Sequence, residues 1–220
     1  MPQSALYYQL KIQVDGVKPS IFRTILVDSE NTFLELHKLI QKLFDLEGYH
    51  LWQFEKGKRQ FMQTIALPIP KDQRMFFNDE PEYNAKKIKL SNIFQNEKDT
   101  VGYWYDFGDD WRFTITLQKI IPQAKLSPQV KKIPLLLNAQ GPMLFEDIGG
   151  PFMMKGILEL YEYLQSKKKL SKKERNEWGN VLGAVLGWDR LEEEGDEDIE
   201  EDFVEMVSDT MNIDWENFSL

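Results

Sequence analysis

The sequence feature that most constrains the fold is the aromatic stretch Tyr103–Trp111, which reads Tyr-Trp-Tyr-Asp-Phe-Gly-Asp-Asp-Trp. Aromatic residues lead into Gly108-Asp109, and an alternating apolar run then follows at Trp111, Phe113, Ile115 and Leu117. Gly and Asp favour tight turns, because they tolerate positive φ or form local hydrogen bonds. The stretch therefore predicts a β-hairpin with its turn at Gly108-Asp109.

The chain before this hairpin predicts two strands joined by a turn. Apolar residues alternate from Leu6 to Val14, which is typical of a strand with one buried face. Asp15-Gly16 forms the turn, and a second strand is expected from Ile21 to Val27. Arg23 lies in this second strand. We interpret it as half of a salt bridge at the sheet edge, with anion binding as the alternative.

A helix and two short strands are expected next. Thr32 and Glu35 form a capping-box pattern at the start of a helix whose apolar residues recur at helical spacing. His37 lies beside this apolar stripe, and we interpret it as a structural histidine rather than a ligand. Strands are then predicted at His50–Phe54 and Arg59–Gln63, on either side of a turn.

The second half of the chain is less regular. Prolines and charges interrupt the pattern from Thr64 to Thr100, which predicts a long excursion with an apolar anchor at Ile88, Leu90, Ile93 and Phe94. Leu135–Leu137 is expected to form a short buried segment. Three helices follow: one begins near Pro151, one at the capping box Ser171/Glu174, and one near Ile199. The acidic run Glu192–Asp202 is expected to be solvated.

These elements predict an α+β protein. Its sheet is twisted and mainly antiparallel, in the order β-β-α-β-β-…-β-β and similar to a β-grasp in its first half, and C-terminal helices pack on it. We expect residues 1–220 to form a single domain, with a sheet portion at 1–122 and a loop plus helical portion at 123–220. Neither half shows a clear linker.

Composition excludes several classes of protein. The chain has 36 acidic and 27 basic residues, for a net charge of −9, which makes broad binding to a nucleic-acid backbone unfavourable. It has no cysteine, so disulfides and thiolate zinc sites are impossible. No apolar run approaches the ~18 residues that a membrane span requires, and the N-terminus does not match a signal peptide. We therefore expect a cytoplasmic protein.

Several segments together carry a family resemblance. They are the hairpin turn Tyr105–Trp111, the segment Glu146–Pro151, the pairs Leu36-His37 and His50-Leu51, and the N-terminal Tyr8–Ile12 and Lys18–Arg23. This combination resembles the plasmid ORF-3-like family, which is named from a reading frame on an Ri-type plasmid. Members are also described as insertion-element passenger proteins, some with a resolvase (TnpR) label. The resemblance covers Tyr7 to Leu164 and implies an α+β domain found on mobile elements and in bacterial and archaeal genomes.

The resemblance implies no settled activity, and the chain departs from the family in two places. Members often have His where this chain has Phe113, and a Cys-Pro-Pro run where it has Pro142–Phe145. Roles that depend on that His or Cys are therefore not carried over. The resolvase label is unsupported as well, because the chain has no serine-recombinase nucleophile with its arginine cluster.

The candidate site lies in the hairpin turn and the Glu146–Pro151 segment, which we expect to meet in space. The candidate binding residues are His50, Trp52, Tyr105, Asp106, Asp109, Asp110, Trp111, Glu146, Asp147, Gly149 and Gly150. Within this group, a divalent cation (Mg²⁺, Mn²⁺ or Ca²⁺) would use His50, Asp106, Asp109, Glu146 and Asp147. Tryptophans Trp52, Trp104 and Trp111 are expected to wall a partly dry pocket.

The alternative is that these residues are structural. Aspartate in a turn caps backbone N–H groups, and acidic residues before a helix favour the positive end of its dipole. In that case Arg112, Arg23 or Lys155 would neutralise the carboxylates. Gly149-Gly150 suits an anion at a helix N-terminus, but the two acidic residues before it would repel one.

Two functional hypotheses follow. The first is a non-enzymatic binding or accessory module whose aromatic and acidic surface receives a basic or polar segment of an unknown protein or peptide. The second is a divalent-metal-dependent hydrolase or nuclease that uses the carboxylates and His50. Net charge argues against a nucleic-acid partner, whereas the mobile-element context of the family allows one. No membrane partner is expected.

Overall fold

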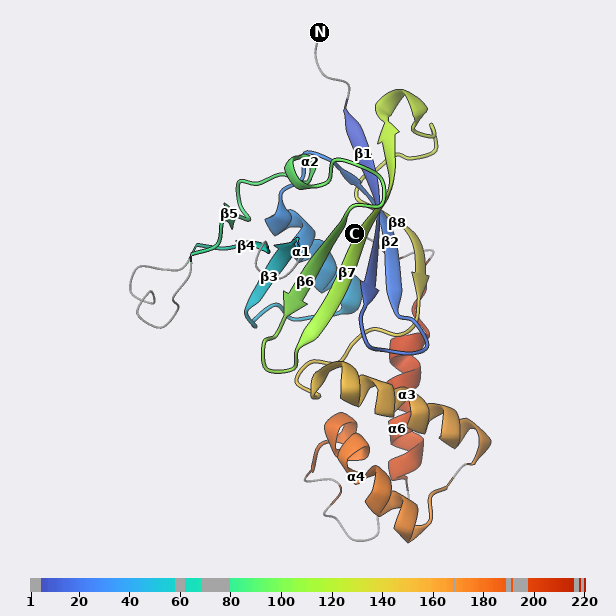
Figure 1. Cartoon of the computed structure of the whole chain (residues 1–220). Coiled ribbons are helices and arrows are strands. Elements are labelled where there is room, and N and C mark those ends of the chain that lie inside the picture. The colour runs from blue at the N-terminus through green and yellow to red at the C-terminus, as the bar shows by residue number, and fades with distance from the viewer. Residues whose placement is uncertain are drawn as a thin grey trace.

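The computed structural model describes residues 5–57, 62–68, 80–167, 169–188, 191, 198–215, 218 and 220. Its centre is an eight-stranded sheet with the strand order β5-β4-β3-β6-β7-β1-β2-β8 (Figure 1). Every named strand pair is antiparallel except β4 with β5. The α+β class and the mainly antiparallel sheet predicted from the sequence are confirmed.

The strands are β1 (Leu6–Val14), β2 (Phe22–Asp28), β3 (Trp52–Lys56), β4 (Gln63–Ala66), β5 (Tyr83–Asn84), β6 (Thr100–Tyr105), β7 (Trp111–Pro122) and β8 (Leu135–Gln140). The helices are α1 (Phe33–Phe44), α2 (Leu90–Ile93), η2 (a 3-10 turn, Gln123–Lys125), α3 (Gly150–Ser166), α4 (Lys172–Leu186) and α6 (Ile199–Met211). None of the helices in the described ranges is long and apolar enough to cross a membrane.

Strand alternation divides the sheet into two different faces. Successive side chains of a strand point to opposite sides, so the apolar set of β1 (Tyr8, Leu10, Ile12 and Val14) is buried while Gln9, Lys11 and Gln13 are only partly buried. Helix α1 lies against the apolar face (Figure 1). The opposite face carries mostly polar side chains.

Helix α1 begins at the capping box predicted from the sequence. The hydroxyl of Thr32 accepts from the N–H of Glu35, and the Glu35 carboxylate accepts from the N–H of Thr32 at 2.6 Å. Two orphan donors of the first turn are thereby satisfied. The apolar stripe of the helix then packs on the hairpin, where the rings of Phe44 and Phe113 meet edge to face with centroids 5.1 Å apart.

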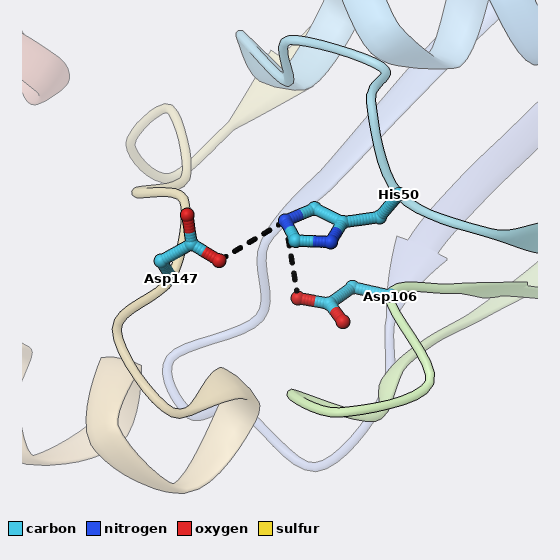
Figure 2. A group of neighbouring side chains, drawn as sticks. All are labelled: His50, Asp106 and Asp147. Carbon is cyan, nitrogen blue, oxygen red and sulfur yellow. Dashed lines mark ion pairs between the residues drawn. The ribbon is translucent and has the colours of Figure 1, made fainter.

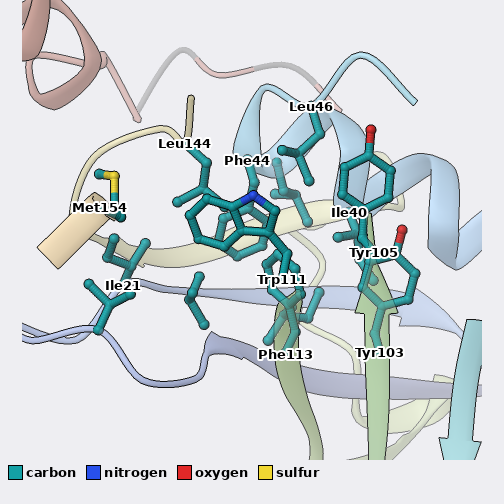
Figure 3. Packing of buried hydrophobic residues seen from close by; sticks show 14 of the residues in the cluster. Ile21, Ile40, Phe44, Leu46, Tyr103, Tyr105, Trp111, Phe113, Leu144 and Met154 are labelled. Atoms are coloured by element: carbon teal, nitrogen blue, oxygen red, sulfur yellow. The ribbon is translucent and has the colours of Figure 1, made fainter. Parts of the chain in front are cut away.

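The predicted hairpin forms between β6 and β7, with Tyr105 opposite Trp111. Trp111 is fully buried, beside Phe44, Leu144 and Met154 (Figure 3). The hairpin therefore contributes a large buried side chain to the core at the end of the sheet that lies next to the start of α3.

The C-terminal helices α3, α4 and α6 pack on one another below the sheet, and α3 also contacts β7 (Figure 1). The predicted capping box at Ser171 and Glu174 is present in α4. Of the acidic run 192–202, residues 192–197 lie outside the described residues. The expectation that the run is solvated is wrong for Glu200, which is buried because its carboxylate accepts from Arg175 Nε at 2.8 Å and pairs α6 with α4.

Three strand predictions need correction. The third strand begins at Trp52 rather than His50, so His50 lies in the loop before it. The fourth strand is displaced to β4, and residues 59–61 of its predicted range lie outside the described residues. Leu135–Leu137 is the start of an edge strand, β8, and Leu137 is 44% exposed. A short apolar run does not distinguish a buried segment from a strand at a sheet edge.

Arg23 is not half of a salt bridge at the sheet edge. Its strand lies between β1 and β8, and its side chain is fully buried. Its guanidinium donates, over 2.7–3.1 Å, to the carbonyl oxygens of Leu43, Phe22, Gln140 and Pro142. It also lies over the rings of Phe44 and Trp215. Burial lowers the pKa of Arg23 to about 9. The salt-bridge prediction fails because the ends of α1 and β8 supply carbonyl acceptors in place of a carboxylate.

Candidate functional site

The hairpin turn and the Glu146–Pro151 segment meet in space, as predicted. The carboxylate of Asp109 accepts from the backbone N–H of Gly149 at 2.9 Å. Gly150 adopts φ +69°, and a Cβ at this position would lie 1.8 Å from the carbonyl oxygen of Asp109. Only glycine permits both this conformation and this approach. The start of α3 is therefore held against the turn.

Four side chains converge at this junction, and we call them the His50 cluster: His50, Asp106, Glu146 and Asp147. The Nε2 atom of His50 lies 3.0 Å from Oδ1 of Asp147, 3.5 Å from Oδ2 of Asp106 and 3.7 Å from Oε2 of Glu146. Figure 2 shows the imidazole between Asp106 and Asp147, which approach it from different loops. Atoms of His50, Asp106 and Asp147 lie within 4.8 Å of one another, which suits a metal ion.

Each carboxylate of the cluster is held through one oxygen and directs the other toward His50. Oδ1 of Asp106 accepts from the N–H of Gly108 at 3.0 Å. Oε1 of Glu146 accepts from the hydroxyl of Tyr105 at 2.9 Å and from the N–H of Glu47. Oδ2 of Asp147 accepts from the hydroxyl of Tyr49. Three anionic oxygens are thus directed at one imidazole nitrogen.

Backbone geometry fixes two of these side chains. Asp106 and Asp147 adopt the left-handed conformation, with φ of 50° and 53°. Aspartate tolerates this region better than most residues, because its short side chain hydrogen-bonds locally. Both carboxylates therefore stand on tight turns and not on the regular strand or helix beside them.

Two buried atoms of the cluster have no hydrogen-bond partner among the described residues: Nε2 of His50 and Oε2 of Glu146. Buried polar atoms in folded proteins are almost always hydrogen-bonded, so each exception requires an explanation such as a bound ion or water. The carboxylates also act on the tyrosines around them. Burial and the hydrogen bond to Glu146 raise the pKa of Tyr105, and the hydrogen bond to Asp147 raises the pKa of Tyr49. Both hydroxyls are protonated donors at neutral pH.

The cations expected to neutralise the cluster have other partners. Arg112 pairs with Asp110 at 2.7 Å and with Glu55 at 3.4 Å, and it lies over the ring of Trp104. Lys155 pairs with Glu159 one helical turn away, and Arg23 is buried among carbonyl groups. Within the described ranges, His50 is the one basic side chain in an ion pair with Asp106, Glu146 or Asp147.

The remaining predicted site residues have other positions. Asp109 holds the N-terminus of α3, and Asp110 pairs with Arg112. The three tryptophans do not form the predicted wall: Trp111 lies in the core, Trp52 stacks on His37 with ring centroids 3.9 Å apart, and Trp104 is tilted against Phe107 with centroids 4.1 Å apart. Trp104 alternates with Tyr103 and Tyr105 along β6, so it points to the opposite face of the sheet.

Two contributors were missed at the sequence level, Tyr49 and the backbone N–H of Glu47. Both lie in the loop between α1 and β3, next to His50. The ring of Tyr49 lies 4.3 Å from that of His50 and covers one side of the cluster. The sequence contained one indication, because Glu47, Gly48, Tyr49 and His50 directly follow the helix. A tyrosine in a loop, however, has no distinctive sequence pattern.

Together the fold and the cluster define an α+β protein with an acidic, imidazole-containing cluster where a mainly antiparallel sheet meets the C-terminal helices. The chain belongs to the family described as Plasmid pRiA4b ORF-3-like protein, which matches residues 6–194. The resemblance drawn from the sequence motifs is confirmed.

Two proteins are similar to this chain over most of its length. The chain is 27% identical over 171 residues to the uncharacterized protein y4hQ of Sinorhizobium fredii, a match that covers 77% of this chain and 79% of that protein. It is 32% identical to a protein of unknown function, MM3350 from Methanosarcina mazei Go1, whose crystal structure superposes with a TM-score of 0.61. That match covers 82% of this chain and 90% of the other.

Proposed function

We propose that this protein is a cation-binding module in which His50, Asp106, Glu146 and Asp147 bind one divalent metal ion. The observation that carries the proposal is that three carboxylates converge on one nitrogen. Nε2 of His50 lies 3.0–3.7 Å from one oxygen of each carboxylate. Ligands about 2.1 Å from a shared ion lie about 3.0 Å apart along the edge of an octahedron. The separation from Asp147 matches that value, and the separations from Asp106 and Glu146 are longer, at 3.5 Å and 3.7 Å.

Electrostatics supports the same conclusion. Carboxylates that share a small volume repel one another unless a cation or a shared proton relieves the repulsion. The neighbouring arginine, Arg112, pairs with Asp110 and Glu55, so it does not supply that charge. A divalent ion would offset two of the three negative charges and would coordinate Nε2 of His50 and Oε2 of Glu146, neither of which makes a hydrogen bond among the described residues.

The donor set favours particular metals. Three carboxylate oxygens suit Mg²⁺, Mn²⁺ and Ca²⁺, and one imidazole favours Mn²⁺ among them. Asp147 is 61% exposed, so one side of the ion would face solvent. Water or an oxygen of a substrate would complete the coordination there.

Isothermal titration calorimetry of the chelator-treated protein with MnCl₂ tests the proposal. We expect saturable binding of one ion, and Glu146→Gln to weaken it by at least roughly tenfold, because a charged ligand becomes a neutral amide. Asp110→Asn is the matched control: it removes a nearby exposed charge that pairs with Arg112 and does not contact His50, so Mn²⁺ binding should persist. Absence of binding by the unmodified protein, or equal losses in both variants, would refute the site.

The hydrolase alternative depends on the exposed side of the same site. A metal ion in contact with water lowers the pKa of that water and generates a nucleophile. Mn²⁺-dependent hydrolysis of bis(p-nitrophenyl) phosphate or p-nitrophenyl acetate that disappears in Glu146→Gln would support an enzyme. Metal binding without turnover of either ester would favour the binding module.

A basic side chain from a partner is the other cation that fits the cluster. Large apolar side chains near it are exposed, among them Tyr49 and Leu51 beside His50, and Phe107 beside Asp106. Exposed apolar residues around a polar centre are typical of an interaction surface. A synthetic Lys-Trp-Lys-Trp peptide that competes with Mn²⁺ would support this occupant, whereas a peptide that leaves the titration unchanged would argue against it.

A further inference from the structure

A groove of about 450 Å³ lies on the polar face of the sheet, away from the His50 cluster. We call it the open-face groove. It is lined by Gln9, Lys11, Phe22, Thr24, Gln118, Leu137 and Asn138, which come from β1, β2, β7 and β8. Its volume falls within the range of sites for small organic molecules.

Two strand irregularities build the walls of this groove. Between β1 and β7 the register passes from Gln9↔Lys119 to Leu10↔Leu117, which leaves Gln118 without a partner residue. Between β2 and β8 it passes from Thr24↔Asn138 to Ile25↔Leu136, which leaves Leu137 unpaired. Both extra residues line the groove. β-Bulges bend a strand and redirect a side chain, and they are enriched next to functional sites.

The lining has a definite chemistry. It contains no acidic side chain, although the whole chain has a net charge of −9. Nζ of Lys11 lies 4.3 Å from the centroid of the Phe22 ring, and in the described part of the chain Lys11 has no carboxylate partner. Nε2 of Gln9 donates to Oε1 of Gln118 at 2.9 Å, which leaves the amide N–H groups of Gln118 available to a ligand.

We propose that the open-face groove binds a small organic oxyanion, a carboxylate or phosphate monoester attached to an apolar group. Lys11 would pair with the anionic head, and Asn138, Gln118 and Thr24 would supply neutral donors. The ring of Phe22 and the side chain of Leu137 would contact the apolar part. This role also explains why Leu137 is exposed on an edge strand. The proposal is independent of the metal site.

A chemical-shift titration of the ¹⁵N-labelled full chain tests this inference. The probes are benzoate, phenyl phosphate and the neutral isostere benzamide. We expect a saturable response for at least one anion, confined to amides near Gln9, Thr24, Gln118 and Asn138, and a response to benzamide at least roughly tenfold weaker. The stronger of the two anions identifies the head group.

Variants make the test specific. Lys11→Met keeps the aliphatic stem over Phe22 but removes the charge, so affinity for the anion should fall by roughly tenfold or more. Lys119→Met, on the neighbouring strand but outside the groove, is the matched control and should bind as the unmodified protein does. Absence of saturation by both anions, equal binding of benzamide, or equal effects of the two lysine substitutions would overturn the proposal.

Discussion

At the scale of single residues, the two histidines of this chain have opposite roles. Nδ1 of His37 lies 2.8 Å from the hydroxyl of Tyr103, and the ring stacks on Trp52 in the core. Burial lowers the pKa of His37 from its ordinary value of 6.5 to about 4, so the folded protein holds it neutral. His50 instead faces three carboxylates in a loop. The structural interpretation of His37 agrees with these contacts.

The buried imidazole predicts a pH dependence of stability. Below pH 6.5 the unfolded chain binds a proton at His37 that the folded chain excludes until about pH 4. The free energy of unfolding should therefore fall with decreasing pH across this window, by up to about 3 kcal/mol in total. Urea denaturation at pH 7 and at pH 4.5 measures the change.

His37→Phe isolates this contribution. Phenylalanine fills the same space without a titratable group, and Tyr103 keeps its hydrogen bond from Gln41. The variant should lose less stability between pH 7 and pH 4.5 than the unmodified protein, whatever its stability at pH 7. Identical pH slopes for the two proteins would show that His37 does not carry the effect.

At the scale of elements, Gly150 fixes the position of α3 against the hairpin. A side chain there would collide with the backbone of Asp109, and the backbone conformation at φ +69° disfavours one as well. Gly150→Ala should therefore destabilise the protein by about 3 kcal/mol or more, because backbone atoms on both sides must move. Thermal or urea unfolding measures the loss.

Gly179, within α4, is the matched control. A Cβ at Gly179 would meet nothing within 4 Å, and alanine is favoured over glycine in a helix interior by roughly 0.5–1 kcal/mol. Gly179→Ala should be neutral or slightly stabilising. A Gly150→Ala protein as stable as the Gly179→Ala protein would contradict the close packing at the start of α3.

At the scale of the whole molecule, the sheet is completed by a strand from the second half of the chain. β8 pairs with β2, and Arg23 of β2 binds carbonyl groups of Gln140 and Pro142. Phe44 and Trp111 pack beside Leu144, which lies in the loop before α3, and Met154, which lies in the first turns of α3 (Figure 3). The two portions therefore share one core.

We predict that the chain unfolds as one cooperative unit. Urea transitions followed by tryptophan fluorescence and by far-ultraviolet circular dichroism should coincide. A truncated chain that ends at Pro122 should not fold, since it lacks β8 and the apolar residues that cover Trp111. Limited proteolysis that releases a stable fragment ending near Pro122 would contradict this prediction.

Local sequence patterns determined most of the elements. The two capping boxes, at Thr32/Glu35 and Ser171/Glu174, and the alternating residues of the hairpin each depend on residues that are close together in the chain. They can therefore be predicted without knowledge of the tertiary structure. The sequence also predicted that the acidic hairpin turn and Glu146–Pro151 would meet, because both lie at the ends of elements and are rich in glycine and acidic residues. Family membership followed from the same motifs.

Only the tertiary structure decided which oxygens face His50 and that Arg23 binds carbonyl groups. It also decided that Glu200 is buried against Arg175, and that Leu137, on an edge strand, lines a groove. Each of these outcomes depends on atoms far apart in the chain. A side chain's charge and polarity are local properties, but its partner is set by how strands and helices pack, and that packing is a property of the whole fold.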